Sequence, residues 1–297
     1  DQLLQDLDRT FKDGKILLAY APTGLGKTAS ALSAAIFHAL EKNKRVFFLT
    51  NRHTQHLLAI DTLQQIQILR SKASGGHEGT SPPSGKKEIT FSGVDLVGKR
   101  WMCSQEIAGL FGNDFNEFCK TIVERGECEF YNNVRNKQQL TVGAKQALSE
   151  LRQRGPLHHK EIHHFSQEQR LCSYEVSLAL AKNATVIVCD YNYLFNPFIR
   201  NNLFTKLDIE VKDIILVVDE GHNLPARVTD MLSSSLTNIV IKNGIMEAKK
   251  FGFQGLLFWL QELMRVLTEL GDFNVKDKLG KEVMKEKLTG KDQFCSK

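Results

Sequence analysis

Short apolar runs and segments of helical spacing follow one another along the chain. Four continuous apolar runs predict strands, because strands buried on both faces of a parallel sheet carry few polar residues; the runs span 15–20, 45–50, 184–190 and 213–219. Apolar residues at helical spacing predict helices over 28–41, about 53–69 and 254–270. The order strand, helix, strand indicates an α/β fold, with a parallel sheet flanked by helices.

The pattern changes between the second and third apolar runs. Residues 71–87 are rich in Gly, Ser and Pro and predict a solvated loop. Residues 98–172 lose strand character and predict short helices and loops, organised by something other than a large apolar core. The sheet is therefore expected to be interrupted by a small insertion.

Four of the nine histidines lie close together near the end of this insertion, at His158, His159, His163 and His164. Basic residues surround them, and the sequence shows no cysteine or carboxylate pair nearby. We predict a solvated basic segment, with a second metal site as the alternative.

Composition narrows the class of protein. The 297 residues are 42% hydrophobic and 25% charged, which is typical of a globular protein and excludes collagenous, wholly disordered and membrane-embedded chains. No apolar stretch approaches the roughly 20 residues of a spanning helix. No signal peptide is visible and the chain opens at Asp1 without Met, so we expect an intracellular protein trimmed from a longer one. A net charge of +5 permits a polyanionic partner without requiring one.

A glycine-rich segment follows the first apolar run. Residues 21–28 read APTGLGKT, which fits the P-loop pattern with Ala in the first position, usually Gly. Its glycines let the backbone N–H groups point at phosphate oxygens, and the next helix adds its positive end. A plain glycine turn is the alternative. The predicted nucleotide contacts are Thr23, Gly24, Leu25, Gly26, Lys27, which reaches the β and γ phosphates, and Thr28, which binds Mg²⁺.

An acidic pair ends the last predicted strand. Open α/β sheets bind ligands at the carboxyl ends of their strands, which is where Asp219 and Glu220 lie. We predict that Asp219 holds Mg²⁺ and that Glu220 orients the water attacking the γ phosphate. His222 either links the γ-phosphate site to another domain or is an ordinary surface histidine.

Four cysteines fall within the insertion or at its end. Cys103, Cys119, Cys128 and Cys172 are 16, 9 and 44 positions apart, without the C-x₂-C pair of a zinc ribbon. Their number is too small for a disulfide scaffold, and their grouping indicates metal ligation in a reducing compartment. Four unrelated buried cysteines are the alternative. Cys189 lies within an apolar run and is predicted to be a core residue, whereas Cys295 has no evident partner.

These motifs together resemble those of the XPD/DinG group of superfamily 2 helicases. The motor motifs of that group are similar to APTGLGKT at 21–28, LTNRHTQ at 49–55, CDYNYLFNP at 189–197 and DEGHNL at 219–224. Its iron-sulfur insertion is similar to GKRWMC at 98–103, the two middle cysteines and LCSYE at 171–175. The order of parts matches over about 15–224. Gly221 stands where the group usually has Ala, a change that we expect to be tolerated.

The resemblance implies a RecA-like motor domain, an inserted iron-sulfur domain and the start of a helical arch. These domains would span 1–97 with 176–232, then 98–175, and finally 233–297. The implied activity is ATP-dependent 5′–3′ translocation and unwinding of DNA in repair, with ATP, Mg²⁺ and a [4Fe-4S] cluster on Cys103, Cys119, Cys128 and Cys172 as cofactors.

The implied partners are single-stranded and forked DNA and repair proteins, with no membrane. The protein would be cytoplasmic or nucleoid-associated in a prokaryote and nuclear in a eukaryote. The group's second motor domain, which contributes an arginine to the ATP site, is missing from this chain, so the chain alone is not expected to unwind DNA. The DNA contacts that the resemblance suggests are Arg52, Gln55, Arg100 and Tyr191, although core packing is an equal alternative for Tyr191.

Two other classes of protein stay open. One is a P-loop ATPase switch or scaffold, in which the cysteine segment docks a protein partner and no strand is translocated. The other is a nucleotide-binding domain stabilised by zinc on the same cysteines.

Overall fold

The computed structural model describes residues 2–20, 22, 24–74, 91–110, 112–137, 139–233 and 236–270. The chain divides into two compact units, Asp1–Leu232 and Ser233–Lys297. The boundary between the units coincides with the predicted end of the motor segment at residue 232. The roles assigned to the segments stay predictions.

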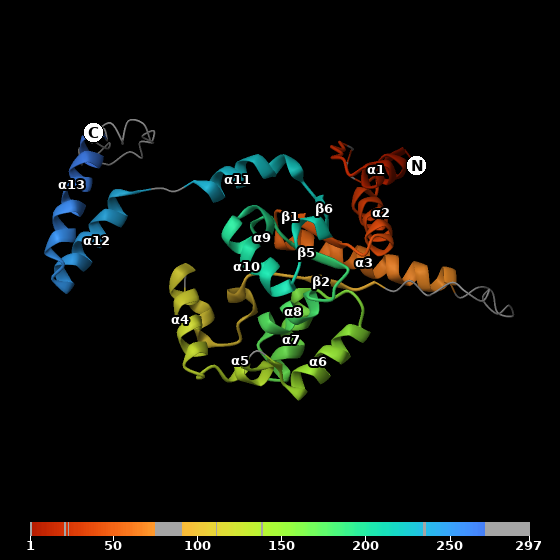
Figure 1. The fold of residues 1–297 in the computed structure, drawn as a ribbon, viewed down its shortest axis with the longest axis horizontal. Coiled ribbons are helices and arrows are strands. Elements are labelled where there is room, and N and C mark those ends of the chain that lie inside the picture. The colour runs from red at the N-terminus through yellow and green to blue at the C-terminus, as the bar shows by residue number, and fades with distance from the viewer. Residues whose placement is uncertain are drawn as a thin grey trace, which may run out of the picture. The chain divides into compact units, whose positions relative to one another are not determined.

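A four-stranded parallel sheet forms the centre of the first unit (Figure 1). Its strand order is β2-β5-β1-β6, with β2 at Gly93–Asp95, β5 at Val186–Asp190, β1 at Arg45–Thr50 and β6 at Ile214–Val218. Val46 on β1 pairs with Val186 on β5 and with Ile215 on β6. The parallel sheet predicted from the apolar runs is confirmed, with β1, β5 and β6 lying within three of those runs.

Alternating residues of β1 supply two separate cores, one on each face of the sheet. Val46 and Phe48 pack with α2 and α3, whereas Phe47 and Leu49 pack with the helices of the opposite face. This follows from the two-residue period of a strand. The helices are α2 (Lys27–Glu41) and α3 (His53–Ser74) on the first face, and α8 (Ser173–Ala181), α9 (Asn192–Phe195) and α10 (Pro197–Leu207) on the second.

The prediction of a strand at residues 15–20 is wrong. Residues 15–20 follow α1 (Gln2–Asp13) as irregular backbone, and the side chains of Ile16, Leu18 and Tyr20 are almost fully exposed. A strand needs a neighbour for its hydrogen bonds, and no described strand pairs with this run. Among the described strands, β6 has one neighbour, β1, and Leu216 on it is 39% exposed. The apolar composition of the run therefore did not suffice to make it a strand.

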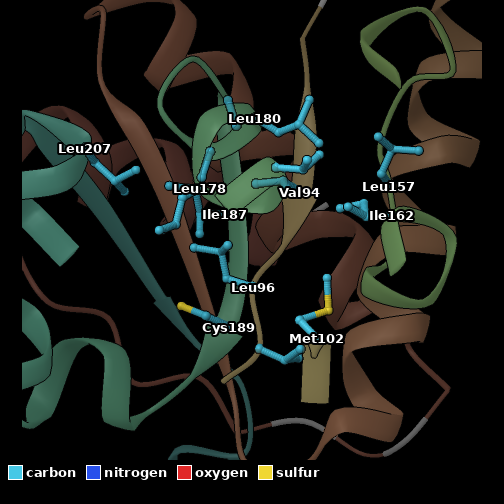
Figure 2. Close-up of a cluster of buried hydrophobic side chains, with 14 of the residues drawn as sticks. Val94, Leu96, Met102, Leu157, Ile162, Leu178, Leu180, Ile187, Cys189 and Leu207 are labelled. Atoms are coloured by element: carbon cyan, nitrogen blue, oxygen red, sulfur yellow. The ribbon is translucent and has the colours of Figure 1, made fainter. Parts of the chain in front are cut away.

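The insertion after β2 has a genuine apolar core, contrary to the expectation for residues 98–172. Leu148, Leu151 and Ile162 are buried in the same cluster as Phe47 and Ile187 of the sheet. Figure 2 shows part of this cluster, where β2, β5 and the insertion meet. The elements of the insertion are η1 (Lys99–Met102), η2 (Glu106–Gly109), α4 (Gly112–Glu124), α5 (Glu129–Val134), β3 (Arg135–Asn136), β4 (Gln139–Leu140), α6 (Val142–Gln153) and α7 (His159–Glu168).

After the sheet the chain becomes helical. The short helix η3 (Val211–Asp213) precedes β6. After β6, η4 (Gly221–Asn223) and α11 (Leu224–Leu232) complete the first unit. The second unit contains a helical hairpin of α12 (Asn238–Phe251) and α13 (Gln254–Leu270), and the latter matches the predicted helix. Gly252, at φ +75°, ends α12 in the left-handed conformation that glycine favours. Among the described helices, none is long and apolar enough to cross a membrane.

Candidate nucleotide site and cysteine cavity

The P-loop segment forms a turn that opens directly into a helix. Gly24 and Gly26 both adopt positive φ, at +88° and +70°, and α2 begins at the next residue, Lys27. Added Cβ atoms on these glycines would meet open space, so the requirement for glycine is conformational. The predicted turn before a helix N-terminus is therefore present. Thr23 lies outside the described residues.

The lysine of this segment lies beside its own loop. Lys27 Nζ donates a hydrogen bond to the carbonyl oxygen of Pro22 at 3.0 Å. Lys27 and Thr28 are half-buried at the start of α2, whereas the side chain of Leu25 is exposed. A long cation at the N-terminus of a helix is suited to an anionic ligand, since both contribute positive potential there.

The acidic pair follows β6 at the carboxyl edge of the sheet. The backbone N–H of Asp219 donates to the carbonyl of Leu49 on β1 at 2.8 Å, which fixes the turn against the neighbouring strand. Glu220 has a positive φ of 52°. A Cβ on Gly221 would meet only Val218, at 3.9 Å, so the structure leaves room for the alanine of related sequences.

The electrostatics of Asp219 connect this turn with the P-loop. Burial raises the pKa of the Asp219 carboxyl, and the negative charge of Glu220 raises that pKa further. The positive charge of Lys27 acts in the opposite direction, which requires the two side chains to lie within electrostatic reach. A bound divalent cation would stabilise the ionised carboxylate in the same way. The two motifs therefore lie close enough for their charges to interact.

Glu220 and His222 are more open to solvent. His222 Nδ1 lies 3.3 Å from Glu220 Oε2, and Asn223 Nδ2 lies 3.1 Å from His222 Nε2. The side chains of Glu220 and His222 are both exposed. This position leaves both groups accessible to a nucleotide or to a further domain.

Tyr191 does not offer the base-stacking face considered from the sequence. Only 2% of the residue is exposed, and its ring belongs to the main core. Its hydroxyl donates to the carbonyl oxygens of Asp219 and Glu220, at 2.5 and 3.0 Å. The core-packing alternative is favoured, and the residue positions the acidic turn from beneath.

The four cysteines of the insertion line one cavity of about 720 Å³. All four are free thiols. They come from four separate places in the chain: Cys103 follows η1, Cys119 lies in α4, Cys128 precedes α5 and Cys172 precedes α8. The sequence offered unrelated buried cysteines as the alternative, and their convergence on a single cavity argues against it.

Burial disfavours ionisation of three of these thiols, Cys103, Cys119 and Cys172. Desolvation raises the pKa of Cys172 to about 12, and it also raises the pKa values of Cys103 and Cys119. Charge on Cys119 and on Cys128 would raise the pKa of Cys103 further, because like charges repel. A metal ion that binds thiolates supplies the positive charge that reverses this cost.

Two lysines counter negative charge beside the cavity. Lys99 and Lys206 both line it, and the ammonium group of each lies 5.4 Å from the ring centroid of Tyr174. Lys99 lowers the pKa of Cys119, and burial lowers the pKa of Lys206. Four thiols with adjacent cations fit an iron-sulfur cluster, whose thiolate ligands bring net negative charge.

The predicted DNA contacts lie after β1 and before Cys103. Arg52 is exposed, while Gln55 Oε1 accepts the backbone N–H of Asn51 at 3.3 Å. The Arg100 guanidinium lies 5.3 Å from the ring centroid of Trp101. The ring of Trp101 in turn packs edge-on against His53, which joins the two segments.

Sequence reasoning missed Trp101. The side chain is 60% exposed beside Arg100, and an exposed aromatic next to cations suits stacking on nucleic-acid bases. Its position in the sequence directly after Lys99 and Arg100 could have indicated such a side chain.

The prediction of a solvated histidine segment is wrong for its first half. His158 and His159 are buried, and the ring of His159 bonds to the buried carboxylate of Asp95. His164 is exposed, as expected. The sequence could not reveal this, because Asp95 lies more than sixty positions away within an apolar run.

Comparison with known proteins places the chain among helicase sequences. The profile of the DEAD_2 family matches residues 61–241. The helicase subunit XPD/RAD3 of general transcription and DNA repair factor IIH from Saccharomyces cerevisiae is 21% identical over 255 residues, covering 80% of this chain and 30% of that protein. The ATP-dependent DNA helicase XPD of Sulfolobus acidocaldarius is 25% identical over 270 residues, covering 91% of this chain and 38% of that protein. The chain thus spans about a third of the length of these relatives.

The fold has a counterpart among solved structures. A protein described as truncated XPD aligns with 99% of this chain and 71% of its own, with a TM-score of 0.55 and 21% sequence identity. This likeness concerns the fold alone. The family match extends over more than half of the chain, and the chain therefore belongs to the DEAD_2 family, as the XPD-type resemblance of its motifs led us to expect.

Proposed function

We propose that this chain is the nucleotide-binding part of an ATP-dependent 5′–3′ DNA helicase of the XPD type that acts in DNA repair. It would supply the first motor domain, at 1–97 and 176–232, the iron-sulfur domain at 98–175 and the start of an arch domain at 233–297. The convergence of four cysteines on one cavity carries the proposal, because it separates this kind of motor from other P-loop ATPases.

The proposed nucleotide site lies between the P-loop and the acidic turn. The backbone N–H groups of residues 23–28 would bind the phosphates, with Lys27 on the β and γ phosphates and Thr28 on Mg²⁺. Asp219 would complete the Mg²⁺ shell, and Glu220 would polarise the attacking water. His222 would connect the γ-phosphate site with the second motor domain. The effect of Lys27 on the pKa of Asp219 supports this pairing.

Cys103, Cys119, Cys128 and Cys172 would hold a [4Fe-4S] cluster. Such a cluster supplies four iron–thiolate bonds that cross-link the segments carrying its ligands. Here those segments are η1, α4 and the N-terminal ends of α5 and α8. Lys99 and Lys206 would balance part of its negative charge.

Single-stranded DNA would cross the surface that carries Arg52, Gln55 and Arg100. The cations would bind phosphates and so position the strand without reading its sequence. Trp101 would add a stacking platform next to Arg100. Tyr191 is left out of this surface because it is buried.

ATP hydrolysis by the full-length protein tests the proposal. We expect single-stranded DNA to stimulate hydrolysis, and Lys27→Ala to abolish turnover while the fold stays intact. Normal turnover in the Lys27→Ala variant would contradict the site. Absence of DNA stimulation at low salt would instead favour an ATPase switch that docks a protein partner.

Binding of labelled single-stranded DNA tests the proposed surface separately. Trp101→Ala is expected to weaken binding by about 1 to 3 kcal/mol, the value of one stacked base. Trp259→Ala is a matched control, since Trp259 is equally exposed but lies in the second unit. Equal losses in the two variants would remove Trp101 from the DNA path.

A further inference from the structure

A group of imidazoles surrounds one buried carboxylate at the base of the insertion. Asp95 on β2 lies with Oδ1 2.5 Å from His56 Nδ1 on α3 and with Oδ2 2.5 Å from His159 Nδ1 at the start of α7. The ligand atoms of these three side chains all lie within 4.8 Å of one another. We call His56, Asp95 and His159 the His–Asp cluster. It is separate from the cysteine cavity, since none of its members lines that cavity.

The cluster is buried, and within the described residues no lysine or arginine pairs with its carboxylate. Asp95 and His56 have no exposed surface, and His159 has little. Within the described residues, only histidines pair with Asp95, and neither lysine nor arginine does. A buried carboxylate is costly to ionise without a positive partner. The balancing charge must therefore come from a protonated imidazole or from a bound cation.

Oδ2 of Asp95 also accepts the backbone N–H of His159 at 3.1 Å, which holds the carboxylate between the two imidazoles. Two imidazole nitrogens and one carboxylate oxygen make a nitrogen and oxygen ligand set.

We propose that His56, Asp95 and His159 form a binding site for one divalent transition-metal ion of the zinc type. Zn²⁺ binds imidazole nitrogen and carboxylate oxygen at about 2.0 to 2.2 Å, and three protein ligands suffice when a fourth position is filled by water or another group. Each imidazole would coordinate through Nδ1, so the proton that Nδ1 now donates to Asp95 would move to Nε2 of the same ring. Within the described residues Nε2 of His56 has no hydrogen-bond partner, so no existing bond opposes that tautomer.

Metal binding would widen the cluster. The present N···O separations of 2.5 Å are those of hydrogen bonds. A tetrahedral ion would hold the same atoms about 3.3 Å apart, given metal–ligand distances of about 2.0 Å. The ion would take the place of the two protons between Nδ1 and the carboxylate, and these protons would be held on the Nε2 atoms of the two rings. It would join α3, β2 and α7 and so tie the sheet to the insertion.

Two further histidines border the cluster in different roles. His158 Nδ1 accepts the backbone N–H of Lys160 at 3.3 Å, and His158 Nε2 lies 3.4 Å from Asp95 Oδ2 without forming a hydrogen bond. His158 therefore borders the carboxylate and is not counted among the ligands. The ring centroid of His53 lies 5.2 Å from that of His56 and 5.9 Å from that of His159, and this imidazole is placed to approach the fourth position.

Cobalt provides a test because Co²⁺ replaces Zn²⁺ and reports its ligands by colour. The full-length protein, with its iron content measured first, is titrated with Co²⁺. We expect one equivalent to give visible ligand-field bands without the strong near-ultraviolet charge-transfer absorption of cobalt thiolate. Added Zn²⁺ should raise Tm, since binding to the folded state alone stabilises it. Absence of any nitrogen- and oxygen-bound Co²⁺ in the wild-type protein would overturn the proposal.

Substitutions locate the ion. Asp95→Asn and His159→Gln keep the shape of the side chains and should remove the cobalt bands and the Zn²⁺-dependent rise in Tm, while iron content stays unchanged. His164→Gln is the control, because His164 lies one turn further along α7, exposed and paired with Glu168. Unchanged cobalt bands in both cluster variants would assign the ion elsewhere. If a variant fails to fold, the wild-type spectrum still decides between nitrogen and oxygen ligands and thiolates.

The proposal does not depend on the helicase function. Loss of iron from the cysteines, or absence of DNA-stimulated hydrolysis, would leave the expected cobalt spectrum of the His–Asp cluster unchanged.

Discussion

Single residues connect the core of the first unit with its candidate nucleotide site. Tyr191 illustrates this, because its ring is packed beneath the sheet edge and its hydroxyl holds two carbonyl groups of the acidic turn. Asp219 and Glu220 are therefore positioned by a buried residue of the core. The structure gives Tyr191 a positioning role.

Tyr191→Phe tests this role. The change removes one hydroxyl donor and keeps the ring, so we expect a loss of about 1 to 3 kcal/mol in the free energy of unfolding, as for other buried polar groups left without a partner. The affinity for Mg²⁺-ATP should fall as well. Tyr193→Phe is the control, since Tyr193 is also buried but makes no bond to the acidic turn. Identical nucleotide affinities in the two variants would contradict the positioning role.

The sequence predicted those site residues that belong to one short motif. Gly24, Gly26 and Lys27 were recognisable because phosphate binding requires them at fixed spacing. The partners of Asp95 and the hydroxyl bonds of Tyr191 were not recognisable, because they join residues far apart in the chain. Each cysteine could be named, but the cavity they share follows only from the fold.

Among the helices and strands, α2 is preceded by a residue whose backbone conformation favours glycine. Gly26 is the last residue before the helix and has φ +70°, a region that costs other residues about 1 to 2 kcal/mol. The turn and the helix are thus coupled at one residue.

Gly26→Ala is therefore expected to lower stability by about 1 to 2 kcal/mol and to reduce nucleotide affinity, because the backbone N–H groups would turn away from the phosphates. Chemical denaturation and binding of a fluorescent ATP analogue measure the two effects. Gly143→Ala should instead raise the free energy of unfolding by about 0.5 to 1 kcal/mol, since Gly143 lies in α6 with open space around the added Cβ. Stabilisation by both substitutions would contradict the assigned turn.

A strand could be predicted from its apolar residues only where the fold also supplies a neighbouring strand for its hydrogen bonds. The apolar run at 45–50 became β1 because β5 and β6 lie on both sides of it. The run at 15–20 has a similar composition and stays exposed, because no described strand pairs with it. Helical periodicity alone sufficed for α13, whose ends match the prediction.

In the molecule as a whole, the sheet and the insertion share one core. Leu148 of α6 belongs to the same buried cluster as Phe47 of β1 and Ile187 of β5. The insertion was expected to be organised by something other than a large apolar core, because residues 98–172 lose strand character. The structure brings them together against the sheet.

Leu148→Ala should therefore weaken the whole first unit. The loss of a buried leucine costs about 2 to 5 kcal/mol, and we expect hydrogen exchange to rise at β1 and β5 as well as within α6. Leu58→Ala, at an exposed position of α3, should change exchange little. Faster exchange confined to the insertion would show that it unfolds as a separate domain.

The proposed [4Fe-4S] cluster in the cavity of four cysteines distinguishes this chain from other P-loop ATPases. Iron and acid-labile sulfide analysis of the anaerobically purified full-length protein tests for it most directly. We predict about four iron and four sulfide per chain, and loss of both on Cys128→Ser. Thiolate-bound zinc without sulfide, or full iron content in the Cys128→Ser variant, would contradict the presence of a cluster on these cysteines.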